Sequence, residues 1–88
     1  MVARRALVTG RVQGVFFRAH VQDAAERHGA SGWAANRGDG SVEIHVEGTP
    51  DAVEAVLAAA RTGSPRSQVE GVHVRAAEPE GCSGFVAR

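Results

Sequence analysis

The sequence contains no lysine and no tyrosine, and it has a single cysteine, Cys82. All ten basic residues are therefore arginines, which excludes lysine Schiff-base chemistry and leaves arginine and backbone N–H groups to hold any phosphate. One cysteine cannot form an internal disulfide, so the fold lacks a covalent crosslink and suits a reducing compartment. Cys82 has no basic residue near it in the sequence, and we expect an inert thiol.

Strong charge bias and long apolar runs are also missing. Ten acidic residues balance the ten arginines, which argues against broad binding to nucleic acid or membrane surfaces, although a local basic patch stays open. No apolar stretch reaches transmembrane length, and the run at residues 6–8 is too short for a signal peptide. We therefore expect a cytoplasmic protein. Its 88 residues predict one domain, residues 1–88, with a modest core.

The first part of the chain predicts a strand, a helix and a second strand. Residues 4–12 have strand character, and Gly14 then turns the chain into a helix that ends before Gly29. Residues 31–36 predict a short strand around Trp33, which we expect in the core. The helix repeats one face at helical spacing, formed by Phe17, Val21, Ala24, Ala25 and His28.

The segment 41–48 has the clearest strand pattern. Asp39 and Gly40 just before it predict a hairpin turn, and we assign Asp39 to shaping that turn. Apolar and polar residues then alternate strictly, which predicts one buried face and one solvated face. The buried face would hold Val42, Ile44 and Val46, and the solvated face Glu43, His45 and Glu47.

The rest of the chain predicts a second helix and two more strands. The helix begins at Thr49, with Pro50 in its first turn, and ends before Gly63. Residues 69–77 and 85–87 have strand patterns. Two split strand–helix–strand units of this kind predict an α+β, ferredoxin-like sandwich: an antiparallel sheet with two helices on one face and a short terminal strand. The fold alone does not define an activity.

The loop before the first helix carries the main functional signal. The chain passes from a strand through Gly14 to a helix N-terminus, where unpaired N–H groups and a partial positive charge favour a phosphate. Arg18 would add a planar fork of donors. From the residues alone, Arg18 is as readily a solvated helix residue and Gly14 a simple turn. The loop is not a Walker A motif, because the lysine and the spacing are missing.

Two blocks of the sequence resemble the acylphosphatase family. Residues 10–18, GRVQGVFFR, are similar to its signature G-x-V-Q-G-V-x-F-R, and residues 32–43, GWAANRGDGSVE, are similar to its second block G-W-x-x-N-x-x-D-G-x-V-E. Residues 63–65 resemble its later glycine–proline turn. The resemblance covers nearly the whole chain and implies a small hydrolase that cleaves the carboxyl–phosphate anhydride of a small-molecule acyl phosphate.

The resemblance also implies a role for individual residues. Arg18 corresponds to the catalytic, phosphate-binding arginine, and Asn36 to the asparagine that orients the attacking water. By sequence alone Asn36 is as readily a turn residue. The resemblance implies direct attack by water, with no covalent intermediate, no cofactor and no metal, and we expect a monomer. The phosphate-binding loop would comprise Gln13, Gly14, Val15, Phe16, Phe17 and Arg18.

Other residues receive structural interpretations. Phe16 is a candidate for the border of the substrate mouth, whereas Phe17 is expected to pack beneath the helix. Glu43 and Glu47 are expected on a solvated face. The four histidines lie in separate elements without metal-ligand spacing, so no metal site is predicted; they are His20, His28, His45 and His73. Departures from the family pattern, expected to affect packing and stability, are His28, Ala30, Ala34, Ser67 and Gln68.

Two other classes of function occur on ferredoxin-like domains. A non-catalytic anion-binding module is one, because acylphosphatase-like domains also occur inside larger carbamoyl-transfer maturation proteins. The absence of zinc-finger cysteines favours a stand-alone enzyme over that alternative. An RNA-binding domain would need exposed aromatic side chains on its central strands, and the strand at 41–48 has none.

Overall fold

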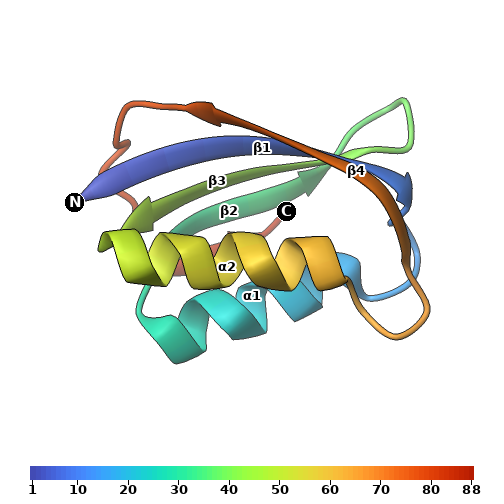
Figure 1. Cartoon of the computed structure of the whole chain (residues 1–88), viewed down its shortest axis with the longest axis horizontal. Helices are drawn as coiled ribbons and strands as arrows, with labels where there is room; N and C mark the ends of the chain where they lie inside the picture. The colour runs from blue at the N-terminus through green and yellow to red at the C-terminus, as the bar shows by residue number, and fades with distance from the viewer.

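The computed structural model describes all residues from 1 to 88, and its elements follow the predicted order. Both helices lie on one side of a single sheet (Figure 1), which confirms the ferredoxin-like α+β sandwich. The elements are β1 Val2–Arg11, α1 Phe17–His28, β2 Ser31–Asn36, β3 Val42–Gly48, α2 Pro50–Thr62, β4 Gln68–Ala76 and β5 Phe85–Ala87.

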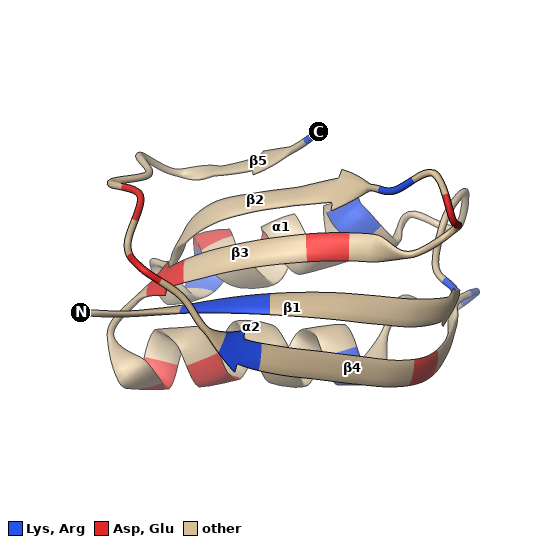
Figure 2. Ribbon diagram, turned by 90° about the horizontal axis from the view of Figure 1, so that it is seen from above, with Lys and Arg blue, Asp and Glu red and all other residues tan.

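The sheet has the strand order β4-β1-β3-β2-β5. Its four long strands pair antiparallel, as predicted, whereas the short β5 pairs parallel with β2. The reason is the path of residues 77–84, which cross from the β4 edge to the β2 edge at one end of the sheet (Figure 2) and bring the chain back alongside β2. This path places the last residues of the chain next to the start of α1, because β5 contacts both β2 and α1.

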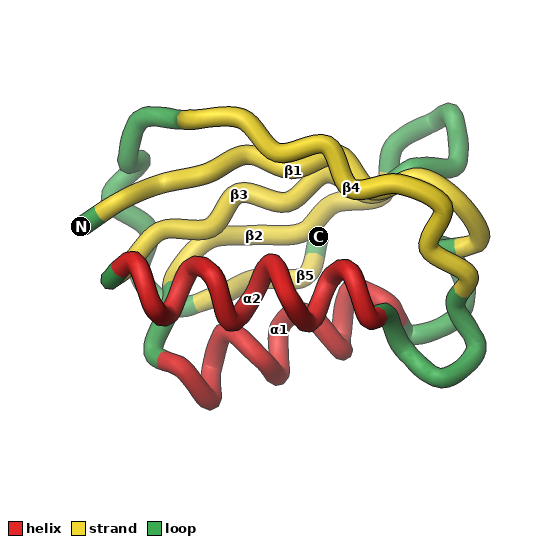
Figure 3. Tube along the Cα trace, viewed as in Figure 1, coloured by secondary structure: helices red, strands yellow, loops and turns green.

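The core lies between the sheet and the two helices (Figure 3). In α1 the predicted apolar face is buried except for His28, which is exposed at the last turn and is a correction to the predicted face. The start of α2 follows the prediction, because the Thr49 hydroxyl accepts a hydrogen bond from the N–H of Ala52 and Pro50 occupies the first turn. The face of α2 that packs in the core is buried and comprises Ala52, Val53, Val56, Leu57 and Ala60.

The second face of β3 differs from the prediction. His45 and Glu47 were expected in solvent, but their exposed fractions are 0% and 2%. The alternation is correct, since Ile44 and its apolar neighbours face the helices, yet residues 77–84 fold over the other face and cover it. Trp33 is buried as expected, but it lies on this outer face, stacked on His45 with ring centroids 5.9 Å apart. Only Glu43 stays partly exposed, paired with Arg5.

Candidate active site

The loop between β1 and α1 has an unusual backbone. Gly14 has a φ of 73°, and Phe16, the N-cap residue of α1, has a φ of 60° and a ψ of 26°, so both are left-handed. Phe16 is the one residue other than glycine with a positive φ. In this conformation the backbone N–H groups of residues 13–19 donate to no acceptor in the protein, and no side chain caps the helix. The loop therefore presents a row of available donors at a helix N-terminus.

Long-range contacts fix this loop. The buried hydroxyl of Ser64 donates to the carbonyl oxygen of Val15 at 2.7 Å. On the opposite side, the Gln13 side-chain amide donates to the carbonyl oxygens of Arg37 and Ser41, at 2.7 and 2.9 Å. All of these bonds use loop carbonyl or side-chain groups and leave the loop N–H groups unpaired. The fold thus holds the donors in place without consuming them.

Arg18 lies in the first turn of α1, and its side chain is partly buried. One guanidinium nitrogen donates to the main-chain oxygen of Arg88. Arg88 is itself held at the edge of β2, because its N–H donates to Ala34 at 2.7 Å and its guanidinium lies 4.5 Å from the centroid of the Trp33 ring. The C-terminal residues therefore orient Arg18, and its remaining N–H donors stay available.

A pocket of about 350 Å³ lies against the loop and the first turn of α1. Arg18 is its only charged residue, and apolar side chains supply most of the remaining surface. Phe17 is buried beneath the helix, as predicted, while the Phe16 ring is 82% exposed at the rim. The lining residues are Val12, Gly14, Phe16, Phe17, Arg18, Ala19 and Ala87.

Asn36 is the last residue of β2 and is exposed. It does not line the pocket, and its side-chain amide forms no hydrogen bond within the protein. Its connection to the loop is indirect: the Gln13 side chain bonds to Arg37 and Ser41, the two residues that close the hairpin immediately after Asn36. Asp39 shapes this hairpin by accepting the N–H and hydroxyl of Ser41, which lower the pKa of its carboxyl.

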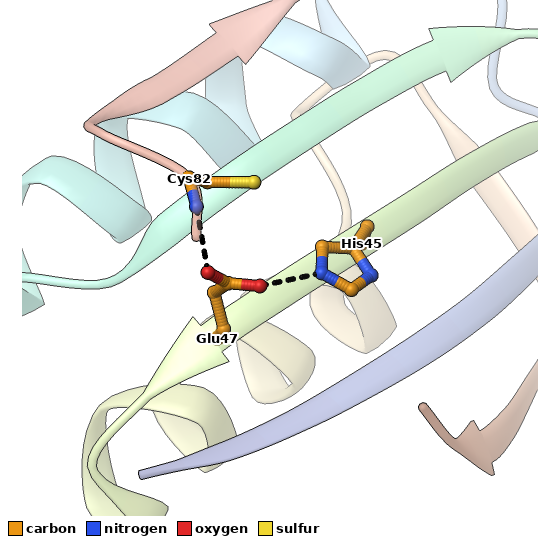
Figure 4. A group of neighbouring side chains, drawn as sticks. All are labelled: His45, Glu47 and Cys82. Carbon is orange, nitrogen blue, oxygen red and sulfur yellow. Dashed lines mark hydrogen bonds and ion pairs between the residues drawn. The ribbon is translucent and has the colours of Figure 1, made fainter. Parts of the chain in front are cut away.

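The structure also gathers potential metal ligands that the sequence analysis did not connect. Ligand atoms of His45, Glu47 and Cys82 lie within 4.8 Å of one another (Figure 4). The Nδ1 atom of His45 accepts from Arg5 at 3.2 Å, so its Nε2 carries the proton and donates to Glu47 at 2.7 Å. A cation at Nε2 would require the opposite tautomer. The prediction of no metal site among the histidines overlooked this cluster, but the hydrogen bonds fit a structural role.

That role is to anchor the segment that covers the outer face. The two carboxylate oxygens of Glu47 accept the backbone N–H groups of Glu80 and Cys82, at 2.7 and 2.8 Å. Burial by itself raises the pKa of Glu47, but the hydrogen bonds from these N–H groups and from His45 outweigh it, and the pKa lies below its ordinary value. Burial, with nearby carboxylates, raises the pKa of Cys82, as an inert thiol requires.

Taken together, a loop of unpaired N–H groups beside an arginine, on a ferredoxin-like sheet, is an arrangement suited to a small anion. The comparisons make the class specific. A sequence model of the Acylphosphatase family matches residues 4–87. An acylphosphatase from Natronomonas pharaonis is 44% identical over 81 residues, which cover 92% of this chain and 88% of that protein.

Solved structures agree with the sequence relatives. The crystal structure of acylphosphatase from Bacillus subtilis has a TM-score of 0.95 and 40% identity, covering 100% of this chain and 99% of that one. Full-length HypF in the phosphate- and nucleotide-bound form is similar over 99% of this chain but only 12% of its own, with a TM-score of 0.85 and 28% identity. The chain belongs to the acylphosphatase family, and the predicted enzyme class, hydrolysis of acyl phosphates, is confirmed.

Proposed function

We propose that this protein holds the phosphate of its acyl phosphate substrate with the backbone N–H groups of residues 13–18 and the guanidinium of Arg18. One observation carries the proposal: the fold braces this loop through its carbonyls and side chains but uses none of its N–H groups, and Arg18 lines the adjoining pocket. A phosphate dianion matches such a set of fixed donors. The fork of Arg18 can bind two phosphate oxygens while one N–H stays with Arg88.

The proposed reaction takes the role of Asn36 from the family resemblance, because Asn36 does not line the pocket. A water held by the Asn36 amide attacks phosphorus, the new oxygen–phosphorus bond forms, and the bond from phosphorus to the carboxylate oxygen breaks. The water's proton passes to a phosphate oxygen of the substrate. The carboxylate is a good leaving group, so the protein needs no strong general acid, and charge stabilisation by the loop and Arg18 supplies the catalysis. The mechanism requires no covalent intermediate, no cofactor and no metal.

The proposal also covers the domain organisation, oligomeric state, location and partner of the enzyme. We infer that residues 1–88 act as one domain and as a monomer in the cytoplasm, with a small-molecule partner only. No helix in the structure is both long and apolar enough to span a bilayer. Phe16 is the one strongly exposed aromatic side chain, and it does not lie on the sheet, so the sheet has no platform for stacking nucleic-acid bases.

The test is hydrolysis of acetyl phosphate with and without a chelator. The unmodified protein should release phosphate at the same rate in both conditions. Arg18→Ala should lower kcat/KM by about 100-fold or more, the usual effect of removing one donor to transition-state charge. Arg27→Ala is the matched control, because Arg27 lies on the same helix but pairs with Asp23 in solvent, and it should keep full activity. Loss of activity with the chelator would contradict the metal-free mechanism.

The alternative left by the sequence, a non-catalytic anion-binding module, disagrees with the family comparisons, which support an acylphosphatase enzyme. The observation in its favour is that the same fold forms one segment of a much larger protein, HypF. Such a module would bind inorganic phosphate and depend on Arg18 for that binding, but it would not hydrolyse acetyl phosphate above the uncatalysed rate. Calorimetry with inorganic phosphate beside the hydrolysis assay separates the two candidates.

A further inference from the structure

Gln13 joins the loop before α1 to the hairpin after β2. Its side-chain Nε2 donates to the carbonyl oxygen of Arg37 at 2.7 Å and to that of Ser41 at 2.9 Å. These are the only hydrogen bonds between the loop at 12–16 and the hairpin at 37–41, which follows Asn36 directly. The amide has two N–H groups, and both are used. The side chain of Gln13 is therefore fully committed to the hairpin.

The two carbonyls that Gln13 holds lie at the two ends of the hairpin. Arg37 follows β2, Ser41 precedes β3, and the N–H of Arg37 donates to the carbonyl oxygen of Ser41 at 2.8 Å. The Ser41 oxygen thus accepts from both Arg37 and Gln13, which matches its two lone pairs. Because both neighbours of the Gln13 amide are acceptors, its NH₂ group must face them. One side chain therefore holds both ends of the hairpin.

Sheet pairing does not join the loop to the hairpin. The ladder between β1 and β3 ends at Val8 and Val42, and Asn36 pairs with Val42 at the same level. Beyond that level, residues 9–11 of β1 pair with β4 alone, and the loop follows from them. The bonds of Gln13 therefore take the place of sheet pairing and set how far Asn36 lies from the loop.

The other contacts of the hairpin do not reach the loop. The guanidinium of Arg37 pairs with Glu43 at 2.6 Å, but the Arg37 side chain is 51% exposed, and ion pairs in solvent contribute little. Asp39 accepts the N–H and hydroxyl of Ser41, and these bonds shape the turn internally. Neither contact relates the hairpin to the residues before α1, so that relation depends on Gln13.

The reaction is sensitive to this relation. Attack on phosphorus requires a water in line with the bond that breaks, and a misplacement of about 1 Å can cost about 100-fold in rate. In the proposed function the phosphate lies on the loop N–H groups, that of Gln13 among them, and the water lies on Asn36. The backbone of Gln13 therefore belongs to the phosphate site, while its side chain holds the hairpin next to the water site.

We propose that the Gln13 side chain is a positioning residue for the attacking water: it fixes Asn36 relative to the phosphate loop and so sets the in-line geometry. This inference rests on the proposed function, which supplies the roles of the loop and of Asn36. Because both N–H groups of the side chain bind the hairpin, it acts on the water through Asn36. Its loss should slow the attack and leave phosphate binding intact.

The test is a double-mutant cycle with Gln13→Met and Asn36→Ala, measured on acetyl phosphate. Methionine has nearly the length of glutamine, lacks an N–H donor and adds no charge beside the phosphate. Gln13→Met should lower kcat by about 10- to 100-fold, while the Kd for inorganic phosphate, measured by calorimetry, stays within about twofold. In the Asn36→Ala background the same substitution should change kcat by less than about twofold, because the group that it positions is absent.

Gln13→Ala is the second variant and should separate kcat from phosphate affinity in the same way. The matched control is Gln68→Met, because Gln68 is exposed on β4 and its side chain forms no hydrogen bond; it should keep full kcat. Equal losses of kcat in both backgrounds, or a loss of phosphate affinity as large as the loss of kcat, would overturn the positioning role and leave the proposed function standing. An unchanged kcat in Asn36→Ala would instead remove the water site from the proposed function, and this inference with it.

Discussion

The phosphate loop and the anchor at Glu47 both collect backbone N–H groups, but they treat them in opposite ways. At the anchor, the N–H groups of Glu80 and Cys82 meet the Glu47 carboxylate, and no buried polar side-chain atom in the protein lacks a partner. At the loop, the N–H groups of residues 13–19 meet no protein acceptor at all. The protein therefore supplies the anion itself at the anchor, and under the proposed function the substrate supplies it at the loop.

Solvent exposure explains the difference. Glu47 is 2% exposed, and an unpaired N–H group beside it would carry the full cost of desolvation. The loop lies at the surface, where water satisfies its donors until a better acceptor arrives. Unpaired backbone donors are thus compatible with a stable fold only where solvent or a ligand reaches them. This contrast distinguishes a candidate binding site from a structural cluster, although both places gather backbone N–H groups.

The largest expected effect comes from a substitution that breaks the anchor at Glu47. Glu47→Gln replaces an acceptor-only carboxylate, which faces three hydrogen-bond donors, by an amide that must turn its NH₂ group toward one of them. The variant should lose about 3 kcal/mol of unfolding free energy, as measured by urea denaturation. The control is Glu54→Gln on the exposed face of α2, which should change little. A Glu47→Gln protein as stable as the unmodified one would show that the anchor is not required.

The next effect concerns the catalytic end. Asn36→Ala should lower kcat for acetyl phosphate by about 100-fold, because the attacking water loses the group that orients it. The affinity for inorganic phosphate should not change, since Asn36 does not line the phosphate pocket. Calorimetry with phosphate checks the second part. Weaker phosphate binding with normal kcat would reverse the assigned roles.

A smaller effect concerns the brace of the phosphate loop. Ser64→Ala removes the hydrogen bond to the carbonyl oxygen of Val15 and leaves that carbonyl buried without this partner. We expect a loss of about 1 kcal/mol in urea denaturation, together with weaker binding of inorganic phosphate. Ser83→Ala is a suitable control, because Ser83 is an exposed serine with no side-chain hydrogen bond. Unchanged phosphate binding in Ser64→Ala would show that the loop holds its shape without this brace.

The smallest effect is a dependence of stability on pH. The pKa of Glu47 in the folded protein lies below its ordinary value of 4.5, so the folded state favours the ionised form. This contribution is fully present above about pH 4.5 and is lost as the pH falls through the lower, folded pKa. The unmodified protein should therefore lose more stability between neutral and acid pH than Glu47→Gln does. If the unfolding free energies of the two proteins, measured by urea denaturation, fall equally between neutral and acid pH, Glu47 does not contribute to the pH dependence.

The sequence predicted the local structure of the loop before α1 well and the anchor at Glu47 badly. Gly14, Phe17 and Arg18 belong to one continuous segment, so strand, turn and helix signals place them without tertiary information. The Glu47 anchor has no such signal. Glu47 occupies a polar position in the alternating pattern of β3, as a solvated residue would. It is buried only because residues 77–84, which carry no periodic pattern, fold over it. A single alternating strand cannot reveal what covers its second face.

The contacts that brace the loop were missed for a related reason. Ser64 and Val15 are 49 residues apart in the sequence, and Gln13 reaches Ser41 across 28 residues. The resemblance implied that the backbone N–H of Gln13 contacts the phosphate, and this N–H is unpaired in the structure. It gave no sign that the side chain of Gln13 joins the loop to the hairpin after Asn36.

Titration of the protein with inorganic phosphate, followed by the amide signals in ¹⁵N-resolved NMR, tests the central claim most directly. The amides of residues 13–18 should shift together and reach saturation with one dissociation constant, while the amides of Glu80 and Cys82, already paired with Glu47, should not move. Arg18→Ala should weaken the same shifts, and Arg27→Ala should leave them unchanged. Shifts at Glu80 and Cys82 with none in the loop would contradict the account, because phosphate would then bind where the fold already supplies an anion.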